Sequence, residues 1–193
     1  MRMRSLIAIC LLLGMVCSVP VPAQSGSGSR NDTRSTLRAA NAEMDRLATK
    51  LAGDWNSTET MERGSFFPRG GSRTGSVQVT LASGGYTLLY EVHSDGTAGK
   101  LDGFHVIWWD QKAQLYRFFS CFNDANEVCV DRGTAHWEGE ALVNDYYFDV
   151  NGKRTPGRDT FTFTRTTHTL IAAMQPEGSG KMTTLITTRA TRR

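Results

Sequence analysis

The sequence predicts an all-β protein, an antiparallel up-and-down β-barrel of about ten strands preceded by one helix. After Trp55 the chain consists of short segments in which apolar and polar residues alternate, which is typical of strands with one buried face. Turn formers such as Gly84-Gly85 and Asn151-Gly152 separate these segments at short intervals. The intervals leave no room for the helices of a βαβ arrangement, and closure into a barrel removes the exposed edges of an open sheet.

The first residues have the three-part pattern of a secretory signal peptide. Arg2 and Arg4 precede an uncharged apolar run (6–16), and small residues around Ala23 predict cleavage after that position. The run is shorter than the roughly 20 residues that a membrane-spanning helix needs. We therefore expect residues 1–23 to be removed, leaving a periplasmic or secreted protein without a transmembrane segment.

Charge and cysteine content narrow the classes of function. The net charge of +3 falls to +1 when Arg2 and Arg4 are removed, and the basic residues cluster only at the C-terminus, which argues against a nucleic-acid binder. Cys121 and Cys129 remain after cleavage, and in an oxidising compartment such a pair favours a disulfide over a metal site. A lipoprotein anchored through Cys17 is an alternative, although the preceding residue is large where lipidation sites usually carry Gly or Ala.

The segment after the signal peptide predicts a linker followed by the helix. Residues 24–35 are rich in Ser, Gly and charged residues and have little to bury, which predicts a flexible linker. From Thr36 onward apolar residues recur at three- and four-residue steps, and Gly53 is suited to end the helix. We expect a helix over 36–52 that plugs or flanks the barrel, within a single domain of residues 36–193. The apolar stripe consists of Leu37, Ala40, Met44, Leu47, Ala48 and Leu51.

Alternation within the strands assigns side chains to the two faces of the sheet. In the segment 86–93 the even-numbered residues Tyr86, Leu88, Tyr90 and Val92 are apolar, so they are expected to face the interior. The predicted strands are residues 54–63, 73–82, 86–93, 101–110, 113–122, 127–137, 140–149, 158–166, 168–175 and 181–190.

One hairpin can be tested for internal consistency. If Cys121 and Cys129 lie opposite one another, the midpoint is Ala125, at the centre of a turn-forming Asp-Ala-Asn sequence. The disulfide and the turn therefore predict the same register.

The same register places polar residues inside the barrel. Tyr116, Arg132 and His136 all fall on the inner face of this hairpin when the cysteines face outward. An isolated charge is too costly to bury. Arg132 is therefore expected either to anchor an anionic ligand or to pair with Glu59, which shares the face of Trp55.

Four short motifs, taken in this order and spacing, resemble a known family. They are Leu51-Ala52-Gly53-Asp54-Trp55, Val106-Ile107-Trp108-Trp109-Asp110 followed by Leu115-Tyr116, Gly133-Thr134-Ala135-His136-Trp137-Glu138-Gly139, and Ile186-Thr187-Thr188-Arg189. The chain resembles, from about residue 47 to 190, a bacterial family of calycin-like (lipocalin-like barrel) domains of unknown function. Where that family tends to carry a compact G-T-W-E-G, this chain inserts Ala135-His136 before the tryptophan.

The resemblance implies a barrel that encloses a cavity. In lipocalin-like members an arginine of the last strand covers the tryptophan of a G-x-W motif. The matching residues here are Arg189 and Trp55, with a structural role: the guanidinium would stack on the indole and keep water from the closed end.

The function expected from these features is binding of a small, partly apolar ligand inside the barrel. The candidate contacts are Tyr90, Tyr116, Arg132, His136 and Tyr146, the polar or aromatic residues assigned to the inner face. An enzyme acting on a small molecule in the same cavity and a structural or partner-binding exported domain without a ligand are the alternatives. The ligand and the oligomeric state stay open.

No catalytic or cofactor site is assigned. The sequence has no nucleophile elbow, and its histidines lack metal-binding spacing. A related barrel family binds haem through a histidine near its C-terminus, and His168 matches that histidine by position alone. We therefore expect no haem and no metal.

Overall fold

The computed structural model describes residues 30–123, 129–150, 152–176 and 178–193. The predicted signal peptide, Cys17 and the first part of the predicted linker lie outside these residues, as does the turn around Ala125. The side chain of Arg132 is likewise outside the described part of the chain.

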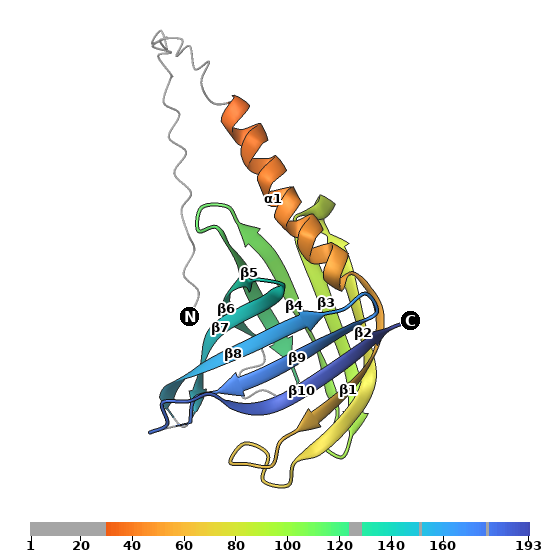
Figure 1. The fold of residues 1–193 in the computed structure, drawn as a ribbon, viewed down its shortest axis with the longest axis vertical. Helices are drawn as coiled ribbons and strands as arrows, with labels where there is room; N and C mark the ends of the chain where they lie inside the picture. The colour runs from red at the N-terminus through yellow and green to blue at the C-terminus, as the bar shows by residue number, and fades with distance from the viewer. Residues whose placement is uncertain (1–29, 124–128, 151, 177) are drawn as a thin grey trace, which may run out of the picture.

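Ten antiparallel strands form a closed barrel, which confirms the predicted fold class (Figure 1). Each strand pairs with the next one in the chain, and β1 pairs with β10 to close the sheet. The strands are β1 (Gly53–Met61), β2 (Gly71–Ala82), β3 (Thr87–Gly96), β4 (Leu101–Asp110), β5 (Leu115–Phe122), β6 (Cys129–Glu138), β7 (Ala141–Val150), β8 (Lys153–Phe163), β9 (Thr167–Met174) and β10 (Thr183–Arg192).

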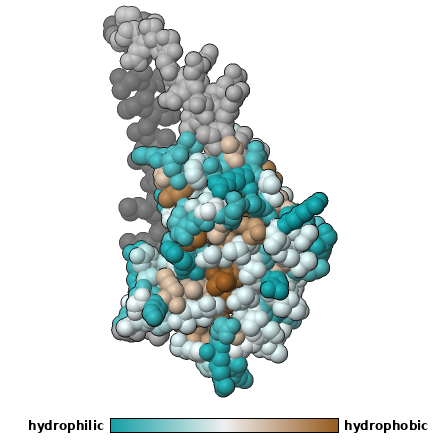
Figure 2. Space-filling model, in the orientation of Figure 1, coloured by the Kyte–Doolittle hydropathy of each residue, from teal (hydrophilic) through white to brown (hydrophobic). Residues whose placement is uncertain are grey.

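The alternation that predicted the strands separates the inside of the barrel from the outside. In β1 every second residue from Trp55 to Met61 is buried, and the residues between them are exposed. In β3, Leu88, Tyr90 and Val92 are buried, as predicted, whereas Tyr86 precedes the strand and is exposed, so its predicted inward placement is wrong. The face of the molecule in Figure 2 is largely hydrophilic or neutral, and its apolar residues form small separate patches. The buried apolar residues form a hydrophobic core inside the barrel.

Strand β8 begins earlier than predicted, at Lys153 instead of Arg158. Pro156 lies in this additional part of β8, and proline cannot donate a ladder hydrogen bond. The pairing explains why it is tolerated: β8 pairs with β9 only from Gly157 onward, so the first residues of β8 pair on one side, with β7.

Helix α1 spans Arg30–Leu51 and therefore begins within the predicted linker. Residues 30–35 contain neither Gly nor Pro, and Asp32 in the first turn is favourable at the positive end of the helix dipole. The composition of the segment is compatible with a linker, yet nothing in these six residues stops a helix. Among the described residues, no helix combines the length and apolarity needed to span a membrane.

The last turns of α1 plug one end of the barrel, one of the two placements expected. Met44, Leu47 and Leu51 are fully buried, and the helix contacts β2, β3, β4 and the short helix η1 (Ser83–Gly85). Burial of each such side chain contributes about 1.5–3 kcal/mol. The hairpins at the opposite end have no such cover from α1 (Figure 1).

The predicted disulfide joins Cys121 to Cys129, and these residues are paired in the register of β5 and β6. The next pairs, Ser120 with Val130 and Phe119 with Asp131, also follow the predicted register. The hairpin next to the disulfide is therefore confirmed.

A β-bulge then changes the register of β6. Arg117 pairs with Thr134, so β6 contains one extra residue relative to β5. Gly133 lies in this bulge with φ of +87°, and a Cβ atom there would lie 2.3 Å from the carbonyl oxygen of Asp145. Because one extra residue exchanges the two faces of a strand, Ala135 is buried and His136 is exposed. The inward placement predicted for His136 is wrong.

Candidate functional site

Trp55 closes the end of the barrel that α1 covers. Its side chain is fully buried, and its Nε1 donates a hydrogen bond of 2.9 Å to the carbonyl oxygen of Leu51 at the end of α1. The ring meets His168 edge-on, with ring centroids 4.5 Å apart. The structural role predicted for Trp55 agrees with these contacts.

Arg192, and not Arg189, covers Trp55. The Arg192 Cζ lies 4.3 Å from the centre of the Trp55 ring, and its Nη1 donates a 2.7 Å hydrogen bond to the carbonyl oxygen of Ala52. Arg192 faces Trp55 in the register of β1 and β10. Arg189 pairs with the exposed Thr58 and is itself exposed, because it lies on the outer face of the strand. The role assigned to Arg189 is therefore wrong.

Gly53, the glycine of the G-x-W motif, makes room for this arginine. A Cβ atom at Gly53 would lie 2.8 Å from Nη1 of Arg192. The motif and the arginine therefore form one structural unit at the closed end.

His168 is buried between the closed end and the interior. Its Nε2 lies 3.3 Å from the hydroxyl oxygen of Tyr90, and no partner of its Nδ1 is found within the described part of the chain. Burial, assisted by the positive charge of Arg192, lowers the pKa of His168 to about 4. The imidazole is therefore neutral at physiological pH, which suits its position among Trp55 and Phe161.

A cavity of about 180 Å³ lies inside the barrel, away from Trp55. Leu101 is the first residue of β4 and Phe122 is the last residue of β5, and both line the cavity. The cavity therefore lies in the half of the barrel opposite α1. The apolar lining residues are Val77, Val92, Leu101, Phe122, Leu170, Ala172 and Ile186, and the polar ones are Glu59, Arg73, Tyr90, His105, Tyr146, Asp159 and Thr188.

The two charged residues at one side of the cavity form a buried pair. Arg73 Nη1 lies 3.5 Å from Glu59 Oε2, and both side chains are almost fully buried. Ser94 donates to Glu59 Oε1 at 3.3 Å, and Arg73 donates to the carbonyl oxygen of Ala98 at 3.2 Å. Such additional hydrogen bonds offset the desolvation cost of the two ions.

Other polar groups of the lining, Tyr146 and Asp159 among them, also form hydrogen bonds. The Tyr146 hydroxyl donates to Asp159 Oδ1 at 2.9 Å, between β7 and β8. Burial, with a contribution from Glu59, raises the pKa of Tyr90 above its usual value, so its hydroxyl stays protonated. The cavity thus offers hydrogen-bonding groups held in place within apolar walls.

His105 and Ser120 form the nearest approach to a catalytic arrangement in the cavity wall. His105 Nδ1 lies 2.6 Å from Ser120 Oγ, across the β4–β5 pair. Ser120 is almost fully buried and is not part of the lining, whereas His105 is. The Ser120 hydroxyl therefore orients the His105 imidazole from the side away from the cavity and cannot contact a ligand there.

The predicted contacts separate into three groups. Tyr90 and Tyr146 line the cavity. Tyr116 faces inward but lies beneath α1, where its hydroxyl donates to the carbonyl oxygen of Glu43 and accepts from Trp137 Nε1, each at 3.0 Å. His136 lies outside the barrel, 3.1 Å from Glu138. Tyr116 and His136 are therefore not cavity contacts.

Sequence analysis missed four polar residues of the lining: Arg73, His105, Asp159 and Thr188. Each shares the parity of buried apolar residues in its own strand, for example Arg73 with Val77. Alternation could have found Arg73, whereas the strand of His105 has apolar residues on both faces. Among the described residues, no group of three or more His, Cys, Asp and Glu residues is placed to hold a metal ion.

Comparison of this chain with protein-family models and with curated protein sequences gives no match. The site is therefore interpreted from its own geometry.

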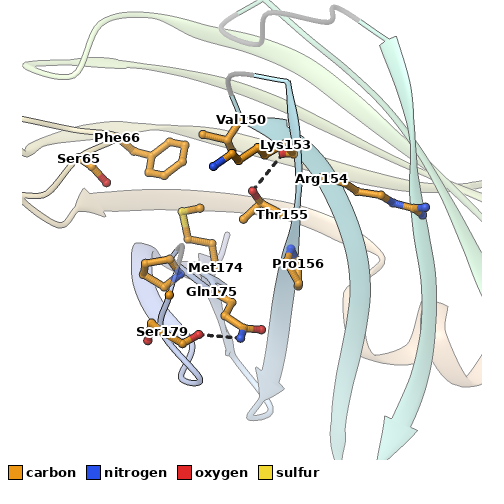
Figure 3. Close-up of a pocket in the computed structure, with 12 residues that line it drawn as sticks. Ser65, Phe66, Val150, Lys153, Arg154, Thr155, Pro156, Met174, Gln175 and Ser179 are labelled. Carbon is orange, nitrogen blue, oxygen red and sulfur yellow. Dashed lines mark hydrogen bonds between the residues drawn. The ribbon is translucent and has the colours of Figure 1, made fainter.

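A second hollow, of about 480 Å³, lies at the end of the barrel opposite α1 (Figure 3). It is formed by the β1–β2 loop, the start of β8 next to the β7–β8 turn, and the β9–β10 loop. We call this hollow the mouth pocket. Its lining residues are Ser65, Phe66, Val150, Lys153, Arg154, Thr155, Pro156, Met174, Gln175, Pro176, Gly178 and Ser179.

Proposed function

We propose that this protein is an exported calycin-like barrel, of the bacterial family that its motifs resemble, and that it binds a small, partly apolar ligand in the interior cavity. The observation that carries the proposal is the cavity itself, which is lined by side chains from β1 to β5 and from β7 to β10. A dry structural core would instead be filled by side chains, as the end beneath α1 is.

The size of the cavity limits the enclosed part of the ligand. An apolar cavity of about 150 Å³ holds benzene, so the interior cavity of about 180 Å³ matches a single ring or a short branched chain. Val77, Val92 and Leu170 supply apolar contacts, and the hydroxyls of Tyr90 and Tyr146 supply polar ones. The two charged side chains Glu59 and Arg73 are already within ion-pair distance of each other. These features favour an uncharged group with one or two hydrogen-bonding atoms.

Export is supported by two features. The N-terminal sequence has the pattern of a signal peptide, and the Cys121–Cys129 disulfide is compatible with an oxidising compartment. The location in the periplasm or outside the cell is part of the proposal.

A pair of substitutions on one strand tests ligand binding in the cavity. Ala172 lines the cavity, whereas Ala173 is the next residue of β9 and pairs with Arg158. We expect native mass spectrometry of the protein purified from its own host to show a small co-purifying molecule. Ala172→Phe should remove that molecule because the ring fills the cavity, and Ala173→Phe on the other face should retain it.

Two results would contradict the proposal. One is a bare mass for the unsubstituted protein, which favours a structural or partner-binding domain. The other is equal retention by both variants, which places the ligand elsewhere. Conversion of the co-purified molecule on incubation with the protein would indicate an enzyme acting in the same cavity.

A further inference from the structure

We propose that the mouth pocket is the outer part of the ligand site and that the ligand is a planar aromatic molecule with an anionic group near Lys153. This inference rests on the proposed function, because it assumes that the inner end of the ligand occupies the interior cavity. It specifies the class of ligand and the direction in which the ligand enters.

A row of aromatic rings connects the mouth pocket with the interior cavity. Phe66 from the β1–β2 loop meets Phe148 edge-on, with centroids 6.1 Å apart, and Phe148 lies 5.8 Å from Tyr146. Phe66 lines the mouth pocket and Tyr146 lines the interior cavity. Strand β9 also extends along both spaces, because Ala172 lines the interior cavity and Met174 lines the mouth pocket. The two spaces therefore lie along one wall of the barrel.

Gly157 of β8 keeps this aromatic row against the wall. A Cβ atom at Gly157 would lie 2.5 Å from Cε2 of Tyr146 and 2.8 Å from Cε1 of Phe148. Without a side chain at this position, both rings pack directly on the strand backbone. In this proposal the rings border the ligand's passage between the two spaces instead of blocking it.

The walls of the mouth pocket suit a flat apolar group. Phe66 and Met174 lie on one side, and Val150 and Pro156 come from the β7–β8 region (Figure 3). Aromatic rings prefer offset or edge-on contacts with other rings, which the Phe66–Phe148–Tyr146 row offers along its length. The volume of about 480 Å³ lies within the range of about 300–1,000 Å³ that is typical of ligand pockets.

Lys153 places a cationic side chain in the mouth pocket, where it can contact an anionic group of a ligand. In Figure 3 the side chain of Lys153 extends toward Phe66, across the pocket. The neighbouring Arg154 extends away from it and stacks on the exposed Tyr147, with Cζ 4.1 Å from the ring centre. An aromatic acid bound with its ring toward Tyr146 would place its carboxylate near the Lys153 ammonium.

Titration calorimetry of the processed protein with 2-naphthoate tests the inference. The comparison compounds are 2-naphthylmethanol, which is uncharged, and decanoate, a flexible anion. We expect saturable binding of 2-naphthoate, with weaker binding of both comparison compounds. Phe66→Ala should weaken 2-naphthoate binding roughly fivefold or more because one edge-on ring contact is lost.

Lys153→Gln should act on charge alone. We expect it to weaken 2-naphthoate roughly fivefold at low salt and to leave 2-naphthylmethanol unchanged. Lys112→Gln is the matched control, since Lys112 lies between β4 and β5 and is not among the lining residues. Gly157→Ala should weaken both naphthyl compounds because it pushes Tyr146 and Phe148 into the passage. Circular dichroism establishes that each variant is folded.

The outcomes separate this inference from the proposed function. Absence of saturable 2-naphthoate binding overturns the inference, as does binding that neither Phe66→Ala nor Lys153→Gln weakens. If neither Phe66→Ala nor Lys153→Gln weakens 2-naphthoate binding but Ala172→Phe abolishes it, the interior cavity is still the site. If Phe66→Ala and Lys153→Gln weaken binding while Ala172→Phe does not, the interior cavity is excluded and the mouth pocket binds on its own.

Discussion

At the scale of single residues, the closed end depends on contacts between the start of β1 and the end of β10, which are far apart in the sequence. Arg192 donates to the carbonyl oxygen of Ala52, 140 residues earlier, and covers Trp55. Gly53 provides the space for its guanidinium. The interaction explains why a G-x-W sequence stands at the start of β1. It also explains why an arginine is needed near the end of β10, on the same face of the sheet as Trp55.

Arg192→Ala is expected to destabilise the protein by about 2 kcal/mol, because it removes a cation–π contact and a hydrogen bond to a partly buried carbonyl. In a domain of this size that corresponds to a fall in the melting temperature of about 4–8 °C. Arg189→Ala, on the outer face of the same strand, should change stability by less than about 0.5 kcal/mol. Thermal denaturation followed by circular dichroism measures both. Equal effects of the two substitutions would contradict the assignment of Arg192.

His168 should make the stability of the protein depend on pH. Its pKa in the folded protein is about 4, whereas an unfolded chain has a histidine pKa of about 6.5. Between these values the unfolded state binds more protons, so stability is complete above about pH 6.5 and decreases as the pH falls toward 4. The loss amounts to about 3 kcal/mol.

Urea denaturation at several pH values between 4 and 7 measures this dependence. His168→Gln removes the titrating group and should flatten the curve over this interval. His136→Gln, at the exposed histidine, serves as the control and should leave the slope unchanged. A slope that persists in His168→Gln would assign the pH dependence to other groups.

At the scale of elements, the bulge in β6 determines which side chains of the β5–β6 hairpin reach the interior. From Cys129 to Asp131 the register is the one that the disulfide imposes. After Gly133 the faces are exchanged, so Ala135 packs in the core. The bulge thus removes His136 from the cavity and leaves small and aromatic residues beneath α1.

Gly133→Ala should destabilise the protein by about 2 kcal/mol or more, since a positive φ and contact with the Asp145 carbonyl both oppose a side chain. Gly139 is a matched control: its φ is +62°, but a Cβ atom there has open space around it. Gly139→Ala should therefore cost only the conformational strain of about 1 kcal/mol. Chemical denaturation compares the two variants. A Gly133→Ala loss no larger than that of Gly139→Ala would show that close approach to β7 is unimportant.

At the scale of the whole molecule, the barrel has two unlike ends. The end beneath α1 is filled by Trp55, Tyr116 and the buried face of the helix. The opposite half holds the interior cavity, and the mouth pocket lies beyond it. This division separates the part that stabilises the fold from the part proposed to bind a ligand.

Much of the fold could be predicted because the relevant signals are local. Alternation along each strand and turn formers between strands predicted the barrel, and the spacing of Cys121 and Cys129 predicted their pairing. The same alternation placed Tyr90 and Tyr146 on the inner face, and both line the cavity. The first turns of α1 were missed because composition alone does not distinguish a polar linker from a polar helix end.

The sequence alone determined the class of fold, the inner face of β3 and the disulfide, since each follows from residues close together in the chain. Only the tertiary structure decided that Arg192 covers Trp55, that β6 changes faces after Gly133, and that Arg73 lies beside Glu59. These features depend on which strands meet when the barrel closes and on how closely their backbones approach. Contacts of that kind join distant parts of the chain, and local sequence patterns do not predict them.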